Sequence, residues 1–261
     1  MSFEEVVKLV ENKTGIQVVG ARLARIKRLF EQDPILFIGL ERESIDQHRW
    51  QRIIDALSVQ ETYFFRDIEV FDCIRRQILP EILKGSYHKD VKIWSAGCAT
   101  GEEAYTLAIL LLETMKSLGY SLQTEKLLVL GTDISKRAID KAKEGVYKNM
   151  PMGSFRNFPG EFMKYFVQHD IGYKLKEEVL NITRFEVHNL LDAYPPIEDA
   201  DLVVCRNVLI YFDEVSKEKA YKTLAQALRR NGCLLLGPLE NPGMGFERRQ
   251  CGRLVYYVKP W

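Results

Sequence analysis

Short apolar segments alternate with amphipathic helical segments over most of the chain, from about residue 68 onward. The apolar segments are VKIWSA, KLLVLGTD, ADLVVCRN and CLLLG, and apolar residues at helical spacing lie between them. Strands that are buried on both faces have near-continuous apolar runs, and helices usually connect them. The alternation therefore predicts an α/β fold with a mostly parallel, Rossmann-like sheet. The final segment, RRQCGRLVYYVKPW, is expected to add one antiparallel strand.

Two regions depart from this alternation. Up to about residue 58 each periodic segment is helical, beginning with a capping-box pattern at Ser2 and Glu5. Between residues 161 and 188, short β-prone runs are separated by turn residues. We therefore predict a small N-terminal helical domain over residues 1–58, an α/β domain over residues 59–261, and a small antiparallel β insert at about residues 161–188 of the second domain.

Composition and charge exclude several classes of protein. The 261 residues carry a formal net charge of +1, so no global field favours nucleic acid. No apolar run approaches the roughly 20 residues that span a bilayer, so no membrane insertion is expected. The five cysteines form no C-x-x-C pair, which predicts neither a metal site nor a disulfide framework. The amino terminus is acidic and amphipathic, unlike a secretory signal. We expect a reduced cytoplasmic protein without a bound metal.

A small-residue turn joins the first predicted strand to the next helix, in WSAGCATGEEAYTLAI. Gly97 and Gly101 let the backbone turn tightly and approach a ligand. The spacing is neither G-x-G-x-x-G nor a phosphate loop, and Glu102 and Glu103 would repel a pyrophosphate at the helix start. They suit a ligand with positive charge. Glutamates in a first turn also complement the helix dipole, and the residues alone leave both interpretations open.

Asp133 ends the next strand, in GTDIS. Nucleoside sites place an acid at this position to accept the ribose hydroxyls. The alternative is a helix cap, but Ser135 already suits that role, which favours the ribose interpretation. An acidic turn and a ribose acid without a phosphate cradle indicate a nucleoside with a cationic tail. S-adenosylmethionine (SAM) has these features.

Three other segments carry polar candidates. VCRNVLIYF places Arg206 and Asn207 at the end of a buried strand, with Tyr211 about one turn later, where they need partners or a ligand. A loop that is merely polar is the alternative. Asn189 could meet an adenine edge or turn the chain. In SVQETYFFRD, Thr62 and Arg66 could enter the cleft or cap a local helix, and the residues alone do not decide.

In series, QETYFFRD, WSAGCATGEEAYTLAI, GTDISKRAIDKAKEGVY and CRNVLIYFD resemble the CheR-type chemotaxis receptor methyltransferases over nearly the whole chain. The resemblance implies a class I methyltransferase fold and methyl transfer from SAM to receptor glutamates, leaving S-adenosylhomocysteine (SAH). The implied partner is the glutamate-rich helical cytoplasmic region of a chemoreceptor, and we expect the enzyme to be a monomer.

The resemblance also implies roles for particular residues. From the chemistry of carboxylate methylation, we ourselves expect Arg66 and Tyr211 to position the acceptor carboxylate or to order the cleft. Gln60 stands where many members have Asn, and GPLEN (237–241) replaces a more usual Gly-His-Ser-Glu, so GPLEN is left out of the site. The residues expected to contact the cofactor are Gln60, Thr62, Arg66, Gly97, Glu103, Asp133, Asn189, Leu190, Arg206 and Asn207.

Acceptor binding has a separate candidate surface. Arg22, Arg25, Lys27 and Arg28 lie within two turns of one predicted helix, and this basic face could dock a glutamate-rich receptor helix. A solvated helix face is the alternative. The hairpin around HDIGYKLKEE is short beside members that grip a receptor tail peptide, so we do not expect tail binding.

Other functions remain open at this point. One is the same methyl transfer to a different protein acceptor, and another is a SAM-binding regulatory module without turnover. A nicotinamide-dependent oxidoreductase is disfavoured because the glycine-rich fingerprint is absent. Methylation of a carboxylate needs no general base, because a free glutamate, with a pKa of about 4.3, is already an anion at neutral pH.

Overall fold

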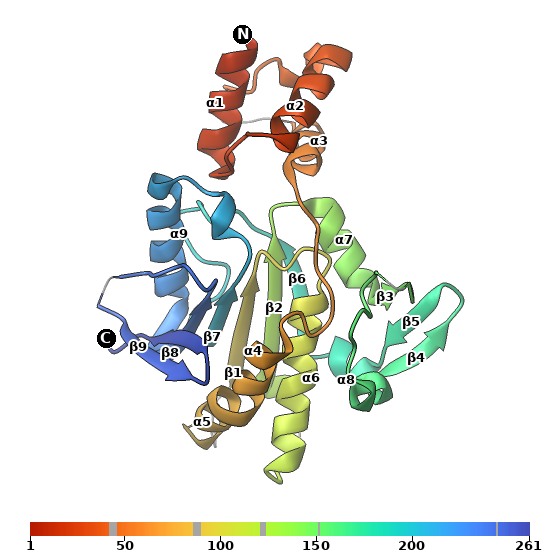
Figure 1. Cartoon of the computed structure of the whole chain (residues 1–261), viewed down its shortest axis with the longest axis vertical. Coiled ribbons are helices and arrows are strands. Elements are labelled where there is room, and N and C mark those ends of the chain that lie inside the picture. Colours follow the sequence, from red (N-terminus) through yellow and green to blue (C-terminus); the bar gives the residue numbers. More distant parts are fainter. Residues whose placement is uncertain (42–45, 86–89, 121–123, 151, 244) are drawn as a thin grey trace.

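One seven-stranded sheet forms the centre of the molecule (Figure 1). The computed structural model describes residues 1–41, 46–85, 90–120, 124–150, 152–243 and 245–261. The strands are β1 (Val91–Ala96), β2 (Leu127–Asp133), β6 (Thr183–Val187), β7 (Ala200–Cys205), β8 (Leu228–Leu236), β9 (Glu247–Cys251) and β10 (Leu254–Val258). Their order in the sheet is β6-β2-β1-β7-β8-β10-β9. The first five in this order are parallel, and β10 and β9 are antiparallel. The predicted Rossmann-like fold is confirmed.

Both faces of the central strands β1, β2 and β7 are buried, as their near-continuous apolar runs predict. Successive residues of a strand point to opposite faces, and Ile93 and Trp94 of β1 accordingly belong to two different apolar clusters. One cluster contains residues of α4 (Ile68–Cys73) and α6 (Glu102–Ser117), and the other contains residues of α9 (Glu214–Ala227). Another helix of this domain, α7 (Lys136–Glu144), follows β2, and the side chain of Ser135 caps its start.

The helix before β1 contains the break that Pro80 predicts. It runs as α4, a π-helical segment η2 (Ile74–Ile78) and α5 (Leu79–Gly85). Proline has no N–H to continue the α-helical pattern, and a π segment is a common way to absorb such an interruption. The short 3-10 helices η3 (Thr124–Lys126) and η5 (Leu209–Tyr211) lie in connections between the main elements.

The N-terminal residues form a helical group with its own apolar core. Its elements are α1 (Phe3–Thr14), α2 (Ala21–Gln32), the 3-10 helix η1 (Pro34–Phe37) and α3 (Gln47–Leu57). The predicted capping box at Ser2 is present. Val6, Ile26 and Ile53 are fully buried in this core. Figure 1 shows the group at one end of the sheet, and Ile16 forms a β-bridge with Phe212, just after η5.

A second, small sheet lies to one side of the main sheet (Figure 1). It is antiparallel and contains β3 (Val146–Tyr147), β5 (Gly172–Leu175) and β4 (Phe166–His169), in this order. Two short helices, η4 (Gly160–Tyr165) and α8 (Glu177–Leu180), accompany it. The small sheet therefore begins before residue 161. The expected range of 161–188 also includes β6, which pairs with β2 in the main sheet.

The C-terminal segment differs from the single strand that was expected. It forms two strands, β9 and β10, which pair antiparallel as a hairpin around Gly252. Gly252 has a φ of +58°, in the left-handed region that glycine adopts at little cost, so the chain can reverse there. The segment RRQCGRLVYY contains this glycine, but β-prone residues on both sides of the glycine are also typical of a single strand.

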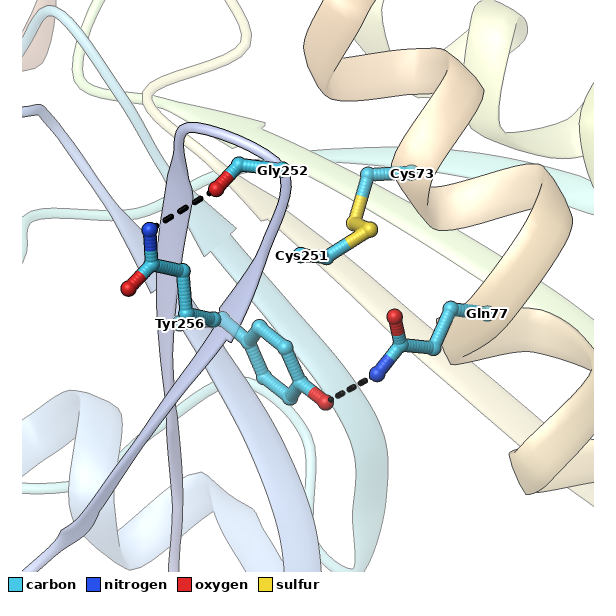
Figure 2. Close-up of a disulfide and its surroundings, with 6 residues drawn as sticks. Cys73, Gln77, Cys251, Gly252 and Tyr256 are labelled. Atoms are coloured by element: carbon cyan, nitrogen blue, oxygen red, sulfur yellow. Dashed lines mark hydrogen bonds between the residues drawn. A yellow bond between two sulfur atoms is a disulfide. The ribbon is translucent and has the colours of Figure 1, made fainter.

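Cys73 of α4 and Cys251 of β9 form a disulfide (Figure 2). This overturns the expectation that no cysteines are paired, and with it the expectation of a fully reduced chain. The two residues are 178 positions apart in the sequence, so their spacing gave no signal. The Nε2 of Gln77 donates to the hydroxyl of Tyr256 at 3.0 Å and joins the same two regions. Cys98, Cys205 and Cys233 are free and buried.

Within the described residues, no cluster of His, Cys, Asp and Glu side chains is placed to hold a metal ion. None of the described helices is both long and apolar enough to cross a membrane.

The disulfide gives a prediction about stability. A reductant should lower the thermal midpoint of the wild-type protein, because a crosslink between such distant residues restricts the unfolded chain, an effect of about 3–5 kcal/mol. Cys73→Ser should have the lower midpoint in either condition and no response to the reductant. Thiol titration of the unfolded, unreduced wild type should find the three free cysteines alone. Five titratable thiols, or an equal response of both proteins, would contradict the pairing.

Candidate active site

A cleft lies beyond the carboxyl ends of β1, β2 and β7, next to the N-terminal helical group. The cleft brings together most of the residues that the sequence analysis singled out: Gln60, Thr62, Arg66, Gly97, Glu103, Asp133, Arg206, Asn207 and Tyr211. Asn189 and Leu190 line a smaller adjoining hollow, which shares Gly97 and Asp133 with the cleft.

The turn after β1 lies close to the loop after β7. Gly97 has a φ of +77°, and a Cβ built on it would come within 2.4 Å of the Cγ2 of Val208. Only glycine combines this φ with this approach at little cost. Ala99, in the same turn, has a φ of +47°, which is uncommon for a residue with a side chain. The backbone of the turn is therefore held in an unusual conformation at the edge of the cleft.

The two glutamates at the start of α6 have different surroundings. The carboxylate of Glu102 is buried and accepts hydrogen bonds from Thr100 Oγ1 at 2.7 Å and Ser154 Oγ at 2.8 Å. Glu103 lines the cleft and accepts a hydrogen bond from Ser95 Oγ at 2.7 Å. Burial raises the pKa of Glu103, while the nearby Arg206 guanidinium opposes that shift. Of these two glutamates, Glu103 is therefore the one that can offer a carboxylate to a ligand.

Asp133 connects the end of β2 to the turn after β1. Its Oδ2 accepts from the backbone N–H of Ala99 at 3.0 Å, and its Oδ1 accepts from that of Ser135 at 2.9 Å. The cap of α7 is Ser135, whose Oγ accepts from the N–H of Ala138. Burial raises the pKa of Asp133. Because a carboxylate has about four lone-pair sites, Asp133 can still accept from ligand hydroxyls.

Arg206 lies at the end of β7 with its side chain 6% exposed. Its Nη2 is 2.7 Å from the Oδ2 of Asp67, and its Nε has no hydrogen-bond partner among the described residues. Phe65, Asp67 and Asn207 all have positive φ angles, between 55° and 63°. Backbone strain of this kind gathers at functional sites. Asp67 was not among the residues predicted from the sequence, although it directly follows Arg66.

The loop before α4 holds Arg66 at the cleft. Its Nη1 donates to the carbonyl oxygen of Glu61 at 2.6 Å. Arg156, from outside the cleft, supports the same loop: its Nη2 is 3.0 Å from a carboxylate oxygen of Glu61, and its guanidinium lies 3.8 Å from the centre of the Tyr63 ring. Gln60 donates from its Nε2 to the Oγ of Ser135 at 3.3 Å.

The predicted basic face of α2 is divided in the structure. Arg22 lines the cleft, and its guanidinium lies 3.9 Å from the centre of the Tyr211 ring. Arg25, Lys27 and Arg28 are exposed. The sequence spacing placed Arg22 with the other three and did not indicate that it faces the cleft.

Asn189 makes contacts other than the expected one. Its Nδ2 donates to the carbonyl oxygen of Lys13 at 2.7 Å, and its Oδ1 accepts from the N–H of Leu191 at 3.0 Å. The side chain thus joins the loop after β6 to the end of α1. Of the two roles that the sequence left open, these contacts match a turn of the chain. One hydrogen of the Asn189 side-chain amide remains for a ligand.

The charges of the cleft fit SAM. Glu103 can pair with an ammonium group, Asp133 can accept from ribose hydroxyls, and the free donors of Arg206 can meet a carboxylate. SAM carries all three groups.

Comparisons with known proteins agree with this fit. The family model described as "CheR methyltransferase, SAM binding domain" matches residues 60–247. A chemotaxis protein methyltransferase of Borreliella burgdorferi is 32% identical over 248 residues, which cover 90% of this chain and 86% of that protein. One from Vibrio anguillarum is 34% identical over 209 residues, covering 78% and 74%. Chemotaxis protein methyltransferase 1 of Pseudomonas aeruginosa is 30% identical over 241 residues, covering 90% and 87%.

The matched range contains the strands, turns and acidic side chains that form the cleft, apart from the contribution of the N-terminal helices. Its description names SAM, the ligand that the charges of the cleft fit, and SAM is therefore the cofactor. On both grounds the chain belongs to the CheR methyltransferase family and is a SAM-dependent methyltransferase.

Proposed function

We propose that this methyltransferase transfers the methyl group of SAM to glutamate side chains of a chemoreceptor, giving glutamate methyl esters and SAH. The observation that carries the proposal is a cleft in which Arg66 and Arg206 stand beside the acidic side chains suited to the cofactor. The names of the relatives, chemotaxis protein methyltransferases, support a receptor of the chemotaxis system as acceptor. Such an acceptor region is cytoplasmic, and we place the reaction there.

The proposed chemistry requires positioning rather than proton transfer. Bound SAM supplies a methyl group on a positively charged sulfur, which a carboxylate oxygen can take in line. The acceptor glutamate is already ionised at neutral pH, since its pKa is about 4.3. The protein then has to orient the carboxylate and to limit the access of water to the cleft. We assign the orienting role to Arg66 and Tyr211. Arg22 packs on the Tyr211 ring and would hold it in place.

The N-terminal helices have a proposed role in covering the cleft. We propose that residues 1–58 are a helical domain and residues 59–261 the methyltransferase domain. The separate apolar core of α1, α2 and α3 supports this division. Two hydrogen bonds support the covering role: Gln51 donates to the carbonyl oxygen of Ile134 at 3.3 Å, and Asn189 donates to that of Lys13.

Methyl transfer to a chemoreceptor cytoplasmic fragment tests the proposed function. Labelled methyl groups from SAM should enter the fragment, mild alkali should release them as methanol, and Glu→Gln changes in the receptor should abolish them. An alkali-stable product would mean a different acceptor group. SAH binding without transfer to any receptor fragment would contradict the proposed acceptor and leave the family assignment unchanged.

Arg66→Ala should lower kcat in this assay roughly 100-fold, because a misplaced acceptor carboxylate loses in-line geometry. Arg156→Ala is the matched control, since it removes a guanidinium that contacts the same loop but does not line the cleft. It should retain most of the activity. Full turnover by Arg66→Ala would defeat the role assigned to Arg66.

Glu103 should make cofactor binding depend on pH. Its charged form pairs with the ammonium group of SAH, and burial raises its pKa, so affinity should fall as the pH is lowered from 8 toward 5. Glu103→Gln should weaken binding about tenfold at pH 8, because it replaces a charged partner by a neutral one. The variant should also lose most of the pH dependence. Isothermal titration calorimetry measures both, and an unchanged pH dependence in Glu103→Gln would exclude Glu103 as the titrating group.

The exposed part of the basic face can be tested apart from the cleft. Arg25→Glu with Arg28→Glu should raise the KM for the receptor fragment about tenfold through charge repulsion and leave the Kd of SAH unchanged. Lys219→Glu with Lys222→Glu on α9 is the control, because it reverses two exposed charges at the same helical spacing. Equal effects of the two pairs, or a change in SAH affinity, would contradict docking on α2.

A further inference from the structure

The hollow beside the cleft is suited to a flat, mostly apolar group. Its apolar lining comes from Ile16, Ile134, Leu190, Val208 and Phe212. Asp133 lines both the hollow and the cleft. A nucleoside with its ribose at Asp133 and its amino-acid end at Glu103 would therefore place its base in this hollow. This step rests on the proposed position of the cofactor.

The polar side chains of the hollow differ in how they are paired. The Oγ1 of Thr14 donates to the carbonyl oxygen of Val10 at 2.7 Å and accepts from the N–H of Ile16 at 3.1 Å. Both polar atoms of the Asn189 side chain are engaged, as described above. His188 differs from both, because its Nε2 is buried and has no hydrogen-bond partner among the described residues. Buried polar atoms are usually paired, so this one calls for a ligand or a water.

The surroundings of His188 fix which hydrogen bond it can make. Its side chain is 8% exposed, and its Nδ1 lies 3.5 Å from the Oδ2 of Asp192. Burial lowers the pKa of His188, against the opposing effects of Asp192 and Glu186, so the ring is neutral at pH 7. A neutral imidazole carries one N–H, which the carboxylate of Asp192 favours on Nδ1. The Nε2 is then a hydrogen-bond acceptor.

We propose that the Nε2 of His188 accepts a hydrogen bond from the exocyclic amino group of the adenine of SAM and thereby selects adenine over hypoxanthine. Hypoxanthine has an oxygen where adenine has this amino group, and an oxygen facing the lone pair of Nε2 leaves two acceptors unpaired. Sites that pair with a ligand N–H reject analogues that lack it far more strongly than apolar contacts can.

Binding of two ligands to the full chain tests the proposal. Calorimetry gives the Kd of SAH and of S-inosylhomocysteine, in which hypoxanthine replaces adenine. The wild type should bind SAH at least about tenfold more tightly. His188→Phe keeps a ring beside Trp94 but removes the hydrogen-bond acceptor. It should raise the Kd of SAH about tenfold and change the Kd of S-inosylhomocysteine little, so that the discrimination between the two ligands is lost. His169→Phe, at an exposed histidine of the small sheet, should match the wild type.

A second variant keeps the test decisive if His188→Phe does not fold. Asp192 has a side chain 57% exposed, so Asp192→Asn should leave the core intact. Without the carboxylate, the N–H is no longer held on Nδ1, and the preference for SAH over the inosyl ligand should shrink. Equal losses for both ligands would mean that His188 only supports the hollow, and no discrimination in the wild type would also overturn the proposal. Failure of the wild type to bind SAH at all would instead contradict the cofactor.

Discussion

The buried carboxylate of Asp133 is the interaction on which the rest of the site depends. It accepts from Ala99 in the turn after β1 and from Ser135 at the start of α7, and so it fixes the ends of two parallel strands relative to each other. The turn can lie where it does only because Gly97 has no Cβ to meet Val208. The same carboxylate lines both the cleft and the hollow. The proposed positions of the base and of the amino-acid end both follow from placing the ribose at Asp133.

Much of this arrangement could be predicted from the sequence because it follows from local patterns. The apolar runs of β1 and β7 predict buried parallel strands, and the carboxyl ends of such strands meet at one edge. Candidates chosen only as strand-end residues, such as Asp133 and Arg206, therefore line one cleft. The capping serine of α7 was equally local: Ser135 accepts from Ala138 as its position predicts.

The remainder could not be predicted because it depends on contacts between distant segments. Nothing near Cys73 indicates that it meets Cys251, and the side of α2 that Arg22 occupies is decided by how the helix packs against Tyr211. Glu102 and Glu103 are neighbours of the same type, and the sequence does not show that Glu102 bonds to Thr100 and to the distant Ser154 while Glu103 lines the cleft. The small sheet differs from the expected range of the β insert for a similar reason, since pairing with β2 assigns β6 to the main sheet.

The proposed mechanism needs positioned charges rather than a nucleophile activated by a base, which agrees with the charged side chains that line the cleft. Its central claim is that one cleft, shared by the turn after β1 and the N-terminal helices, holds the cofactor in a single orientation. A crystal structure of the complex with SAH tests that claim most directly. The account predicts ribose hydroxyls at hydrogen-bond distance from Asp133 and the ammonium group at Glu103. SAH bound elsewhere, or with its base at Glu103, would contradict it.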